Sequence, residues 1–300
     1  MAAARELDYR PSGVARALKR RTTLTLGLLV TDIENPFFPQ IVRAVEDAAH
    51  ELGYGLLLCN AADDPRRELA YLDLLLERRV DGIVVASSRV TRRHAARLAA
   101  APTPVVLVNS EAPGSGLAAI TTAHRRGARL VTEHLLALGH RVIGHVTAPR
   151  ANAAAGLRLA GVRDAMRLRG VQPDDLHIAV GDGHVAGGQF AAEALLVVDG
   201  LTALVCYNDL TAFGALRAVR AAGLSVPEDI SVVGFDDIDL AAWTDPPLTT
   251  VRQRTAEMGR WAVKRLAAQL SSTASADGPA TVHLAPELVV RDSTAPLPAP

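Results

Sequence analysis

One repeating pattern, which begins at Leu24, restricts the fold of this chain more than any other feature. A short run of β-branched or leucine residues is followed by a polar break, and then by an Ala-, Leu- and Arg-rich segment with helical spacing. The pattern predicts strands over residues 24–31, 55–59, 82–86, 104–108, 142–146, 176–180, 203–206 and 231–235. It predicts helices over residues 37–52, 66–78, 91–100, 126–138, 156–169, 186–198, 210–222 and 255–270.

The predicted strands are apolar on both faces and alternate with helices, which is typical of parallel sheets covered on both sides. Eight units of one strand and one helix are more than one open sheet usually contains. We therefore predict an α/β fold with two doubly wound parallel-sheet lobes. A single closed (β/α)₈ barrel is the alternative architecture.

The alternation stalls at two places. The first is Ala112-Pro113-Gly114-Ser115-Gly116, which precedes a short predicted strand over 118–121, and the second is the proline-containing segment 244–251. A chain that crosses between its lobes more than once forms a hinge. We therefore expect the lobes to be joined by a hinge with several crossovers.

Composition narrows the class of protein. The chain of 300 residues is 49% hydrophobic, with 32 basic and 32 acidic side chains, which is enough for two ordinary globular domains. No run reaches the roughly 18 to 20 apolar residues of a membrane-spanning helix, and the first residues lack the apolar stretch of a secretory signal. We expect a cytoplasmic protein that does not bind membranes.

No motif of an enzyme or a metal site is present. The sequence lacks a phosphate-binding loop, a nucleophile elbow and the usual metal-ligand spacings. Cys59 and Cys206 each end an apolar run, which favours packing over chemistry. His134, His140 and His145 are expected on a helix, in a turn and on a strand, so a shared metal is not expected. We predict a protein that is not an enzyme and that uses no cofactor or metal.

The N-terminal segment is strongly basic. Within residues 1–21, only two acidic side chains accompany the basic residues Arg5, Arg10, Arg16, Lys19, Arg20 and Arg21. Such an excess is typical of a segment that contacts a polyanion such as DNA. A solvated basic tail is the alternative interpretation of the charge alone.

Several short motifs occur in a specific order along the whole chain. They are Tyr9-Arg10-Pro11-Ser12 with Val14 to Leu18, Asn35-Pro36-Phe37-Phe38, Leu138-Gly139-His140-Arg141, Arg158-Leu159-Ala160-Gly161, Asn208-Asp209, Gly234-Phe235-Asp236-Asp237 and Pro247 to Gln253. In their order and spacing they resemble the LacI/GalR family of bacterial transcription regulators.

The resemblance implies a repressor with a helix-turn-helix headpiece, a hinge helix and a two-lobed effector domain similar to periplasmic sugar-binding proteins. Residues 1–22 would be the remnant of the headpiece and the hinge helix. Residues 23–123 with 252–274 would form the N-terminal lobe, and residues 124–251 with 275–300 the C-terminal lobe.

The hinge helix would supply the DNA contacts. By resemblance, Leu18 inserts between bases of the minor groove, and Val14 and Ala15 pack against the same helix of a second copy. The phosphates would be approached by Arg16, Lys19, Arg20 and Arg21. Leu18 could instead cover the top of the effector core. Only Ala2 to Leu7 correspond to the third headpiece helix, so we expect this chain to bind DNA weakly and with little sequence preference.

Ligands of doubly wound sheets bind beyond the carboxyl ends of the strands. Polar and aromatic residues that follow predicted strands are therefore candidates for effector binding: Asn35, Phe37, Phe38, Ser87, Asn109, Asn208 and Asp236. The resemblance adds Arg158 as a donor to ligand hydroxyls and Gln253, which would reach the ligand from the hinge. Asp236 would accept from two hydroxyls.

The two neighbouring phenylalanines and Asp209 have alternative interpretations. Phe38 is the better candidate for stacking on a sugar ring, whereas Phe37 is as readily a core residue. Asp209 is expected to be a helix N-cap rather than a ligand contact.

The sequence departs from the family at strand four, where Asn109-Ser110 replaces the Asp-Arg of many sugar-binding relatives. The effector, a sugar or sugar derivative, would then be smaller, more apolar, or held mainly by the second lobe. Dimerisation is expected through helices such as 66–78 and 210–222. A sugar-binding receptor that does not bind DNA is the alternative function, and the sequence does not indicate whether ligand releases or promotes DNA binding.

Overall fold

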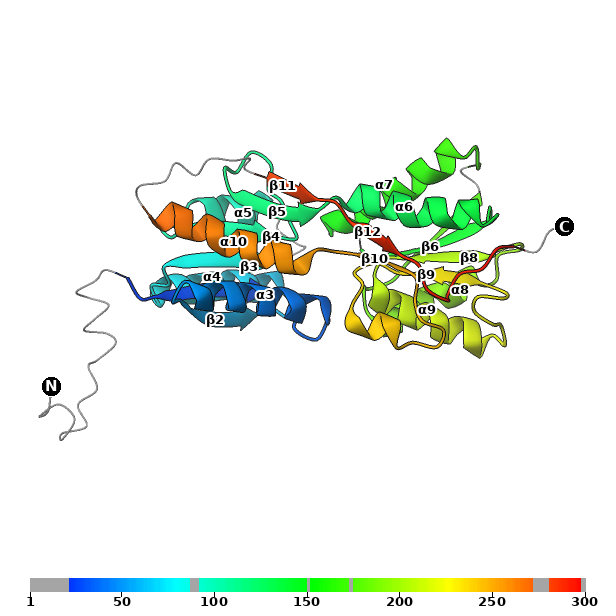
Figure 1. Ribbon diagram of the computed structural model, residues 1–300, viewed down its shortest axis with the longest axis horizontal. Helices are drawn as coiled ribbons and strands as arrows, with labels where there is room; N and C mark the ends of the chain where they lie inside the picture. The colour runs from blue at the N-terminus through cyan, green and yellow to red at the C-terminus, as the bar shows by residue number, and fades with distance from the viewer. Residues whose placement is uncertain (1–21, 87–91, 150–151, 173–174, 272–280, 298–300) are drawn as a thin grey trace, which may run out of the picture. The chain divides into compact units, whose positions relative to one another are not determined.

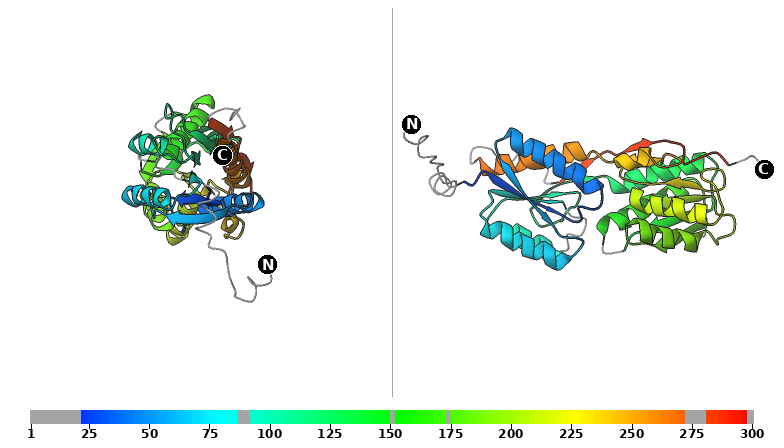
Figure 2. Two further views of the ribbon diagram at one scale, coloured as in Figure 1. Left: turned by 90° about the vertical axis from the view of Figure 1, so that its left-hand side faces the viewer. Right: turned by 90° about the horizontal axis from the view of Figure 1, so that it is seen from below.

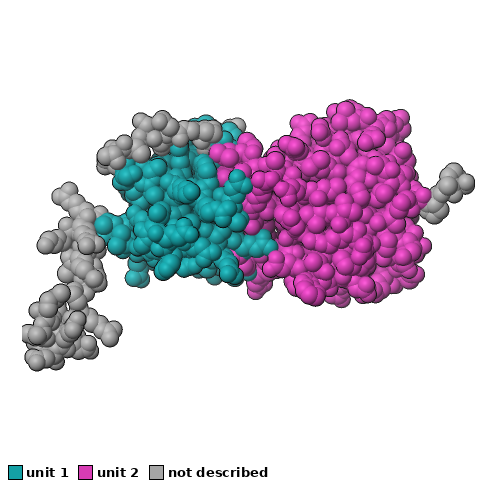
Figure 3. Space-filling model, viewed as in Figure 1, with its two compact units in different colours: residues 1–33, 40–119, 256–281 teal, residues 34–39, 120–255, 282–300 magenta. Residues whose placement is uncertain are grey.

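The computed structural model describes residues 22–86, 92–149, 152–172, 175–271 and 281–297. The chain divides into two compact units, coloured teal and magenta in Figure 3. Unit 1 comprises Met1–Ile33, Gln40–Ala119 and Ala256–Thr281, and unit 2 comprises Glu34–Pro39, Ile120–Thr255 and Val282–Pro300. The chain therefore passes between the units several times. The lobe boundaries expected from the sequence stay a prediction.

A six-stranded sheet with the strand order β11-β5-β4-β3-β1-β2 forms the centre of unit 1, and its strands β5 and β11 continue into unit 2. The strands of this sheet are β1 (Thr25–Val30), β2 (Gly55–Asn60), β3 (Gly82–Ala86), β4 (Val105–Val108), β5 (Ala118–Thr122) and β11 (Thr281–Leu284). β1 lies parallel to both β2 and β3, and β3 lies parallel to β4. A central β1 with neighbours on both sides defines a doubly wound sheet.

Helices cover both faces of this sheet, as Figure 2 shows. α3 (Phe37–Glu51) and α10 (Thr255–Leu270) lie on one face, and α4 (Pro65–Glu77) and α5 (Arg92–Ala99) lie on the other. Asp64 caps α4 by accepting a hydrogen bond of 2.8 Å from Arg66 N–H, as its position before Pro65 predicts.

Unit 2 contains a four-stranded parallel sheet with the order β7-β6-β8-β9. Its strands are β6 (Ile143–Thr147), β7 (Leu176–Val180), β8 (Ala203–Cys206) and β9 (Ser231–Val233). Figure 1 shows α6 (His124–Ala137) and α7 (Ala153–Leu168) on one face, with α8 (Val185–Leu195) and α9 (Asp209–Ala221) on the other. Two further short strands, β10 (Thr250–Arg252) and β12 (Glu287–Val289), pair with each other in antiparallel fashion.

The core of unit 2 lies between its sheet and α6 and α7. Val162 and Ala165 of α7 pack there with Ile143 of β6, and all three are fully buried. α6 and α7 approach closely at Gly161, where an added Cβ would lie 2.2 Å from the carbonyl oxygen of Arg125. Glycine at this position is therefore required by the spacing of the two helices.

The predicted α/β class with parallel sheets in two units is confirmed, and the single closed barrel is wrong, because the strands form separate sheets. Several boundaries differ from prediction by one to three residues, for example at the end of α8, which is Leu195 rather than residue 198. α6 begins at His124 rather than residue 126, and α7 begins at Ala153 rather than residue 156 because Asn152 caps it. β9 ends at Val233, because Asp236 and Asp237 adopt left-handed φ values of 126° and 56°.

Some predictions concern residues outside the described ranges. These are the DNA contacts at Val14, Ala15, Arg16, Leu18, Lys19 and Arg20, and the effector contact at Ser87. Of the helices that are described, none is long and apolar enough to cross a membrane.

Candidate functional site

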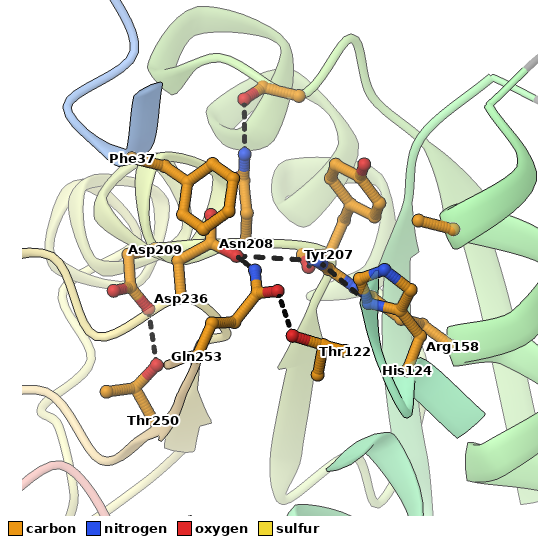
Figure 4. A network of polar contacts seen from close by, with 12 residues as sticks. Phe37, Thr122, His124, Arg158, Tyr207, Asn208, Asp209, Asp236, Thr250 and Gln253 are labelled. Atoms are coloured by element: carbon orange, nitrogen blue, oxygen red, sulfur yellow. Dashed lines mark hydrogen bonds and ion pairs between the residues drawn. The ribbon is translucent and has the colours of Figure 1, made fainter. Parts of the chain in front are cut away.

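A buried polar network surrounds Arg158 in unit 2 (Figure 4). Arg158 projects from α7, and its side chain is only 4% exposed. Its Nη1 donates a hydrogen bond to the main-chain carbonyl of Tyr207. Its Nη2 lies 3.4 Å from Oδ1 of Asp236 and 3.5 Å from Nδ1 of His124. The guanidinium is thus held from two sides before any ligand is considered.

Two aromatic rings fix the plane of the guanidinium. The Cζ atom of Arg158 lies 3.7 Å from the centroid of the Phe235 ring and 4.6 Å from that of Tyr207. Both distances are within the range of a cation–π interaction, which is strongest where water is excluded. The Tyr207 ring is itself held, since its hydroxyl accepts a hydrogen bond of 2.6 Å from Asn152.

Gln253 and Thr122 complete the network on the side of Asp236. Gln253 Nε2 donates to Oδ1 of Asp236 at 2.7 Å, and the Thr122 hydroxyl donates to Gln253 Oε1 at 2.6 Å. These two bonds define which way the Gln253 amide points. Both of the side-chain hydrogen bonds that Asp236 accepts from Arg158 and Gln253 go to its Oδ1.

A second buried carboxylate, Asp209, lies at the start of α9. Its Oδ2 accepts from Ile238 N–H at 2.9 Å, and its Oδ1 accepts from the Thr250 hydroxyl at 2.5 Å. The predicted N-cap role of Asp209 is wrong: Asn208 caps the helix, because its Oδ1 accepts from Thr211 N–H at 2.8 Å. Asp209 instead ties α9 to the segment that carries β10.

Burial controls the protonation of these groups. It raises the pKa of Asp209, and the neighbouring Asp236 carboxylate raises it further. Burial also raises the pKa of Asp236, although the Arg158 guanidinium opposes that shift. The pKa of His124 lies well below its usual value, first because of burial and then because of Arg158. The network therefore contains a neutral imidazole beside an arginine.

The two phenylalanines occupy different places. Phe37 and Phe38 are both buried, and their rings meet edge to face with centroids 5.4 Å apart. In Figure 4 the Phe37 ring is drawn above Asn208 and Asp236, and residues 34–39 belong to unit 2. Phe37 is thus the ring seen at the polar network, and the stacking role expected of Phe38 stays a prediction.

Two predicted ligand contacts have other structural tasks. Asn35 Oδ1 accepts from Phe37 N–H at 3.1 Å, which starts α3. Asn208 uses both ends of its amide, since Nδ2 donates to the Gly183 carbonyl at 2.9 Å while Oδ1 caps α9. Their direct contact with an effector remains a prediction.

In unit 1, the polar atoms at the end of β4 are buried and unpartnered. Asn109 adopts a left-handed φ of 57°, which asparagine tolerates better than most residues. Among the described residues, neither Asn109 Oδ1 nor Ser110 Oγ has a hydrogen-bond partner. Buried polar atoms without a partner are costly, and a ligand could satisfy them.

Sequence reasoning missed four members of the network: Thr122, His124, Tyr207 and Thr250. Thr122 ends β5, and Tyr207 directly follows β8, so the strand-end rule could have found both. His124 and Thr250 carry no such signal, because their partners come from distant parts of the chain.

The network offers hydrogen-bond donors, a carboxylate oxygen and an aromatic ring, with the charges of Arg158 and Asp236 opposed. Such a set binds a small polar molecule. Among the residues that the structure describes, no cluster of His, Cys, Asp and Glu could hold a metal ion. Two doubly wound units with this cluster at the strand ends define a ligand-binding protein of the periplasmic-binding-protein class.

Comparison with known proteins supports that class. A family model described as "Periplasmic binding protein-like domain" matches residues 132–294. The "HTH-type transcriptional repressor PurR" of Haemophilus influenzae (strain PittEE) is 34% identical over 295 residues, which is 98% of this chain and 88% of that protein. The chain belongs to the LacI/GalR family of transcriptional regulators. It is a transcriptional repressor with an effector-binding domain, and not an enzyme.

Two solved structures are similar over most of the chain. A lac repressor dimer bound to operator and the anti-inducer ONPF is 30% identical, covering 96% of this chain and 99% of its own, with a TM-score of 0.84. A LacI family transcriptional regulator from Enterococcus faecium with bound ribose is 31% identical, covering 91% of this chain and 100% of its own, with a TM-score of 0.80.

Proposed function

We propose that the effector of this repressor is a small, uncharged sugar or sugar derivative, and that Arg158, Asp236 and Gln253 bind its hydroxyl groups. The remaining contacts would come from Asn35, Phe37, Phe38, Ser87, Asn109 and Asn208. The observation that carries the proposal is the buried Arg158–Asp236–Gln253 cluster, in which both of these side-chain bonds go to Asp236 Oδ1, so that Oδ2 would accept from a ligand hydroxyl. The ribose-bound relative is consistent with it.

The balance of charge favours an uncharged effector over a sugar phosphate. The one cation of the described network, Arg158, already faces Asp236 at 3.4 Å, and Asp209 is a second carboxylate nearby. A phosphate would need an additional cation to offset the loss of its hydration. A neutral polyol requires only hydrogen-bond donors and acceptors.

We further propose that the repressor acts as a homodimer on operator DNA in the cytoplasm. The lac repressor dimer on operator supports this assembly. Val14, Ala15 and Leu18 would make the minor-groove and hinge contacts. The phosphates would be contacted by Arg16, Lys19 and Arg20.

Large apolar side chains on the surface of unit 2 are consistent with a dimer. Phe190 of α8 is 73% exposed and Trp243 is 83% exposed. Exposed residues of this size are typical of protein–protein contacts. Phe190 lies on α8, and Trp243 directly follows a short 3₁₀ helix over Asp239–Ala242, so they extend the predicted interface beyond helices 66–78 and 210–222.

A thermal-shift screen tests the effector proposal. Free pentoses, hexoses, polyols and the corresponding sugar phosphates are added to the purified protein. We expect at least one uncharged sugar to raise the melting temperature and Arg158→Ala to abolish the shift. A shift produced only by sugar phosphates would contradict the proposal.

The DNA part is tested separately with a longer version of the protein that carries a complete headpiece, because residues 1–22 alone are expected to bind DNA weakly. A duplex that carries the promoter region of its own gene is titrated with and without the sugar identified in the screen. We expect the sugar to change the affinity. Equal affinity in both titrations would contradict regulation by this effector.

A further inference from the structure

A second buried histidine, His145, lies in the same layer as Arg158. It occupies the middle of β6, and its side chain is only 1% exposed. Side chains alternate along a strand, so His145 points to the same face as Ile143, which packs against α6 and α7. Arg158 precedes Val162 by one turn of α7, and Val162 packs in that same layer.

Both side chains are anchored to the same strand. His145 Nδ1 lies 2.9 Å from the carbonyl oxygen of Val205, and Arg158 Nη1 donates to the carbonyl of Tyr207. Tyr207 N–H donates to Val146 at 2.8 Å, so the sheet ladder continues past the end of β8. Equivalent atoms two residues apart on a strand are about 6.6 Å apart.

Each side chain has one buried nitrogen without a partner. Among the residues that the structure describes, neither His145 Nε2 nor Arg158 Nε has a hydrogen-bond partner. Because a carbonyl can only accept, His145 carries its proton on Nδ1, and Nε2 is an acceptor. Arg158 Nε–H is a donor. The two unpartnered atoms are therefore complementary.

One water molecule can bridge a donor and an acceptor that lie up to about 5.8 Å apart, since each of its two hydrogen bonds spans about 2.9 Å. Buried waters typically satisfy such otherwise unpartnered groups.

We propose that His145 is a positioning residue for Arg158: its Nε2 and one buried water molecule hold the Nε–H edge of the guanidinium. The proposal rests on the proposed function of Arg158 in effector binding. Tyr207 accepts from Nη1, and Asp236 and His124 lie beside Nη2, so Nε–H is the part of the guanidinium left for His145 to hold. The direction in which Arg158 presents its donors is then fixed before the ligand arrives.

The electrostatics agree with this role. Burial lowers the pKa of His145 to about 4, and the charges of Arg158 and Arg163 on α7 add to the effect. The imidazole is thus neutral at physiological pH, and a neutral ring is required if Nε2 is to accept.

The test uses the effector-free protein with ¹⁵N-labelled arginine and histidine. We expect the histidine spectrum at pH 7 to show that His145 is protonated on Nδ1 and not on Nε2. We expect Arg158 Nε–H to exchange with solvent about tenfold more slowly in the wild type than in His145→Leu, as the loss of one buried hydrogen bond implies. His145→Gln, which retains an acceptor, should restore exchange to within about threefold.

His134→Leu is the matched control. His134 lies in unit 2 and contacts Thr294 rather than Arg158, so its removal should leave the Arg158 signal unchanged. A proton on His145 Nε2, or equal exchange in the wild type and His145→Leu, would overturn the proposal. Should His145→Leu not fold, a crystal structure of the wild type decides the question by showing a water within hydrogen-bond distance of both nitrogens, or none.

The same proteins separate this inference from the proposed function. D-Ribose is titrated into the wild type and each variant. Slow Arg158 exchange without ribose binding would uphold the positioning role and count against ribose as effector. Ribose binding that depends on Arg158 but not on His145 would uphold the effector site and overturn the positioning role.

Discussion

The polar network around Arg158 in unit 2 and the end of β4 in unit 1 differ in how far the protein itself satisfies their buried polar groups: most groups of the network have protein partners, although Arg158 Nε has none among the described residues. In unit 2, Arg158, Asp236 and Gln253 bond to one another, so the cluster is ordered by the protein itself. In unit 1, Asn109 Oδ1 and Ser110 Oγ are buried and have no partner among the described residues. The first arrangement stabilises the fold, whereas the second costs stability until something binds.

Because of this difference, we expect mutations in the two units to affect stability and effector affinity differently. A change in unit 2 should lower both stability and effector affinity, because the same contacts serve both. A change at Ser110 should lower affinity alone. The comparison is therefore open to direct measurement.

The largest effect is expected for Arg158→Met. The substitution leaves the buried Asp236 carboxylate without its cation, and breaking a buried ion pair from one side typically costs about 3–5 kcal/mol. Urea unfolding should report a loss of this size, and calorimetry should detect no effector binding. Arg167→Met, which removes a 75% exposed partner of Asp164, should change stability by less than about 0.5 kcal/mol. Equal losses of unfolding free energy in the two variants would contradict the structural importance of the network around Arg158.

The second effect concerns pH. Burial lowers the folded-state pKa of His145 to about 4, below the ordinary histidine pKa of 6.5, so the unfolded chain binds more protons than the folded one between these two pH values. Stability should therefore rise with pH through this window and reach its full value above about pH 6.5. A shift of this size corresponds to about 3 kcal/mol.

The contribution of His145 to the pH dependence of stability must be measured with single-residue variants, because Asp209 and Asp236 change the stability in the opposite direction as pH rises. Their raised pKa values make the folded state bind more protons, so their contribution falls as pH rises through the folded pKa. In His145→Leu, the loss of unfolding free energy between pH 6.5 and 4 should be smaller than in the wild type by about 3 kcal/mol. An identical pH profile would contradict the lowered pKa of His145.

The smallest effect is expected for Ser110→Ala in unit 1. Removing a buried hydroxyl without a partner should leave the free energy of unfolding unchanged or raise it by up to about 1 kcal/mol. Effector affinity should fall by about tenfold, since one hydrogen bond to the ligand is lost. Differential scanning calorimetry checks the expected stability, and a binding titration checks the expected effector affinity. A clear loss of stability would show that Ser110 has a structural partner after all.

Much of the fold was predictable because it depends on local sequence. The alternation of apolar runs and helical segments placed most strands and helices within a residue or two of their observed bounds, as for β7 at 176–180 and α10 at 255–270. The errors at the starts of α7 and α9 arose where a side chain caps a helix by accepting a hydrogen bond from a backbone N–H two or three residues later. Asn152 starts α7 earlier than its hydrophobic pattern indicates, and Asn208 takes the cap that Asp209 was expected to make.

The candidate site was only partly predictable. Asp236 was identified by its place after a predicted strand, and Arg158 and Gln253 by resemblance; the structure brings the three together. The bond between Thr122 and Gln253 joins residues 131 positions apart, and no periodicity in the sequence encodes that meeting. Likewise, the nearness of His145 to Arg158 follows from strand register and helix packing. Their individual positions in the sequence do not reveal it.

The close approach of α6 and α7 at Gly161 has a consequence for how the repressor could change its response to effector. A methyl group at this position would meet the Arg125 carbonyl at 2.2 Å and push α7 away from its neighbour. Arg158 lies about one turn earlier on that helix, so its reach would change although no ligand contact had been altered. Selection for repressors that no longer respond to their effector, or that respond to a different one, would thus find variants at a glycine outside the proposed effector and DNA contacts.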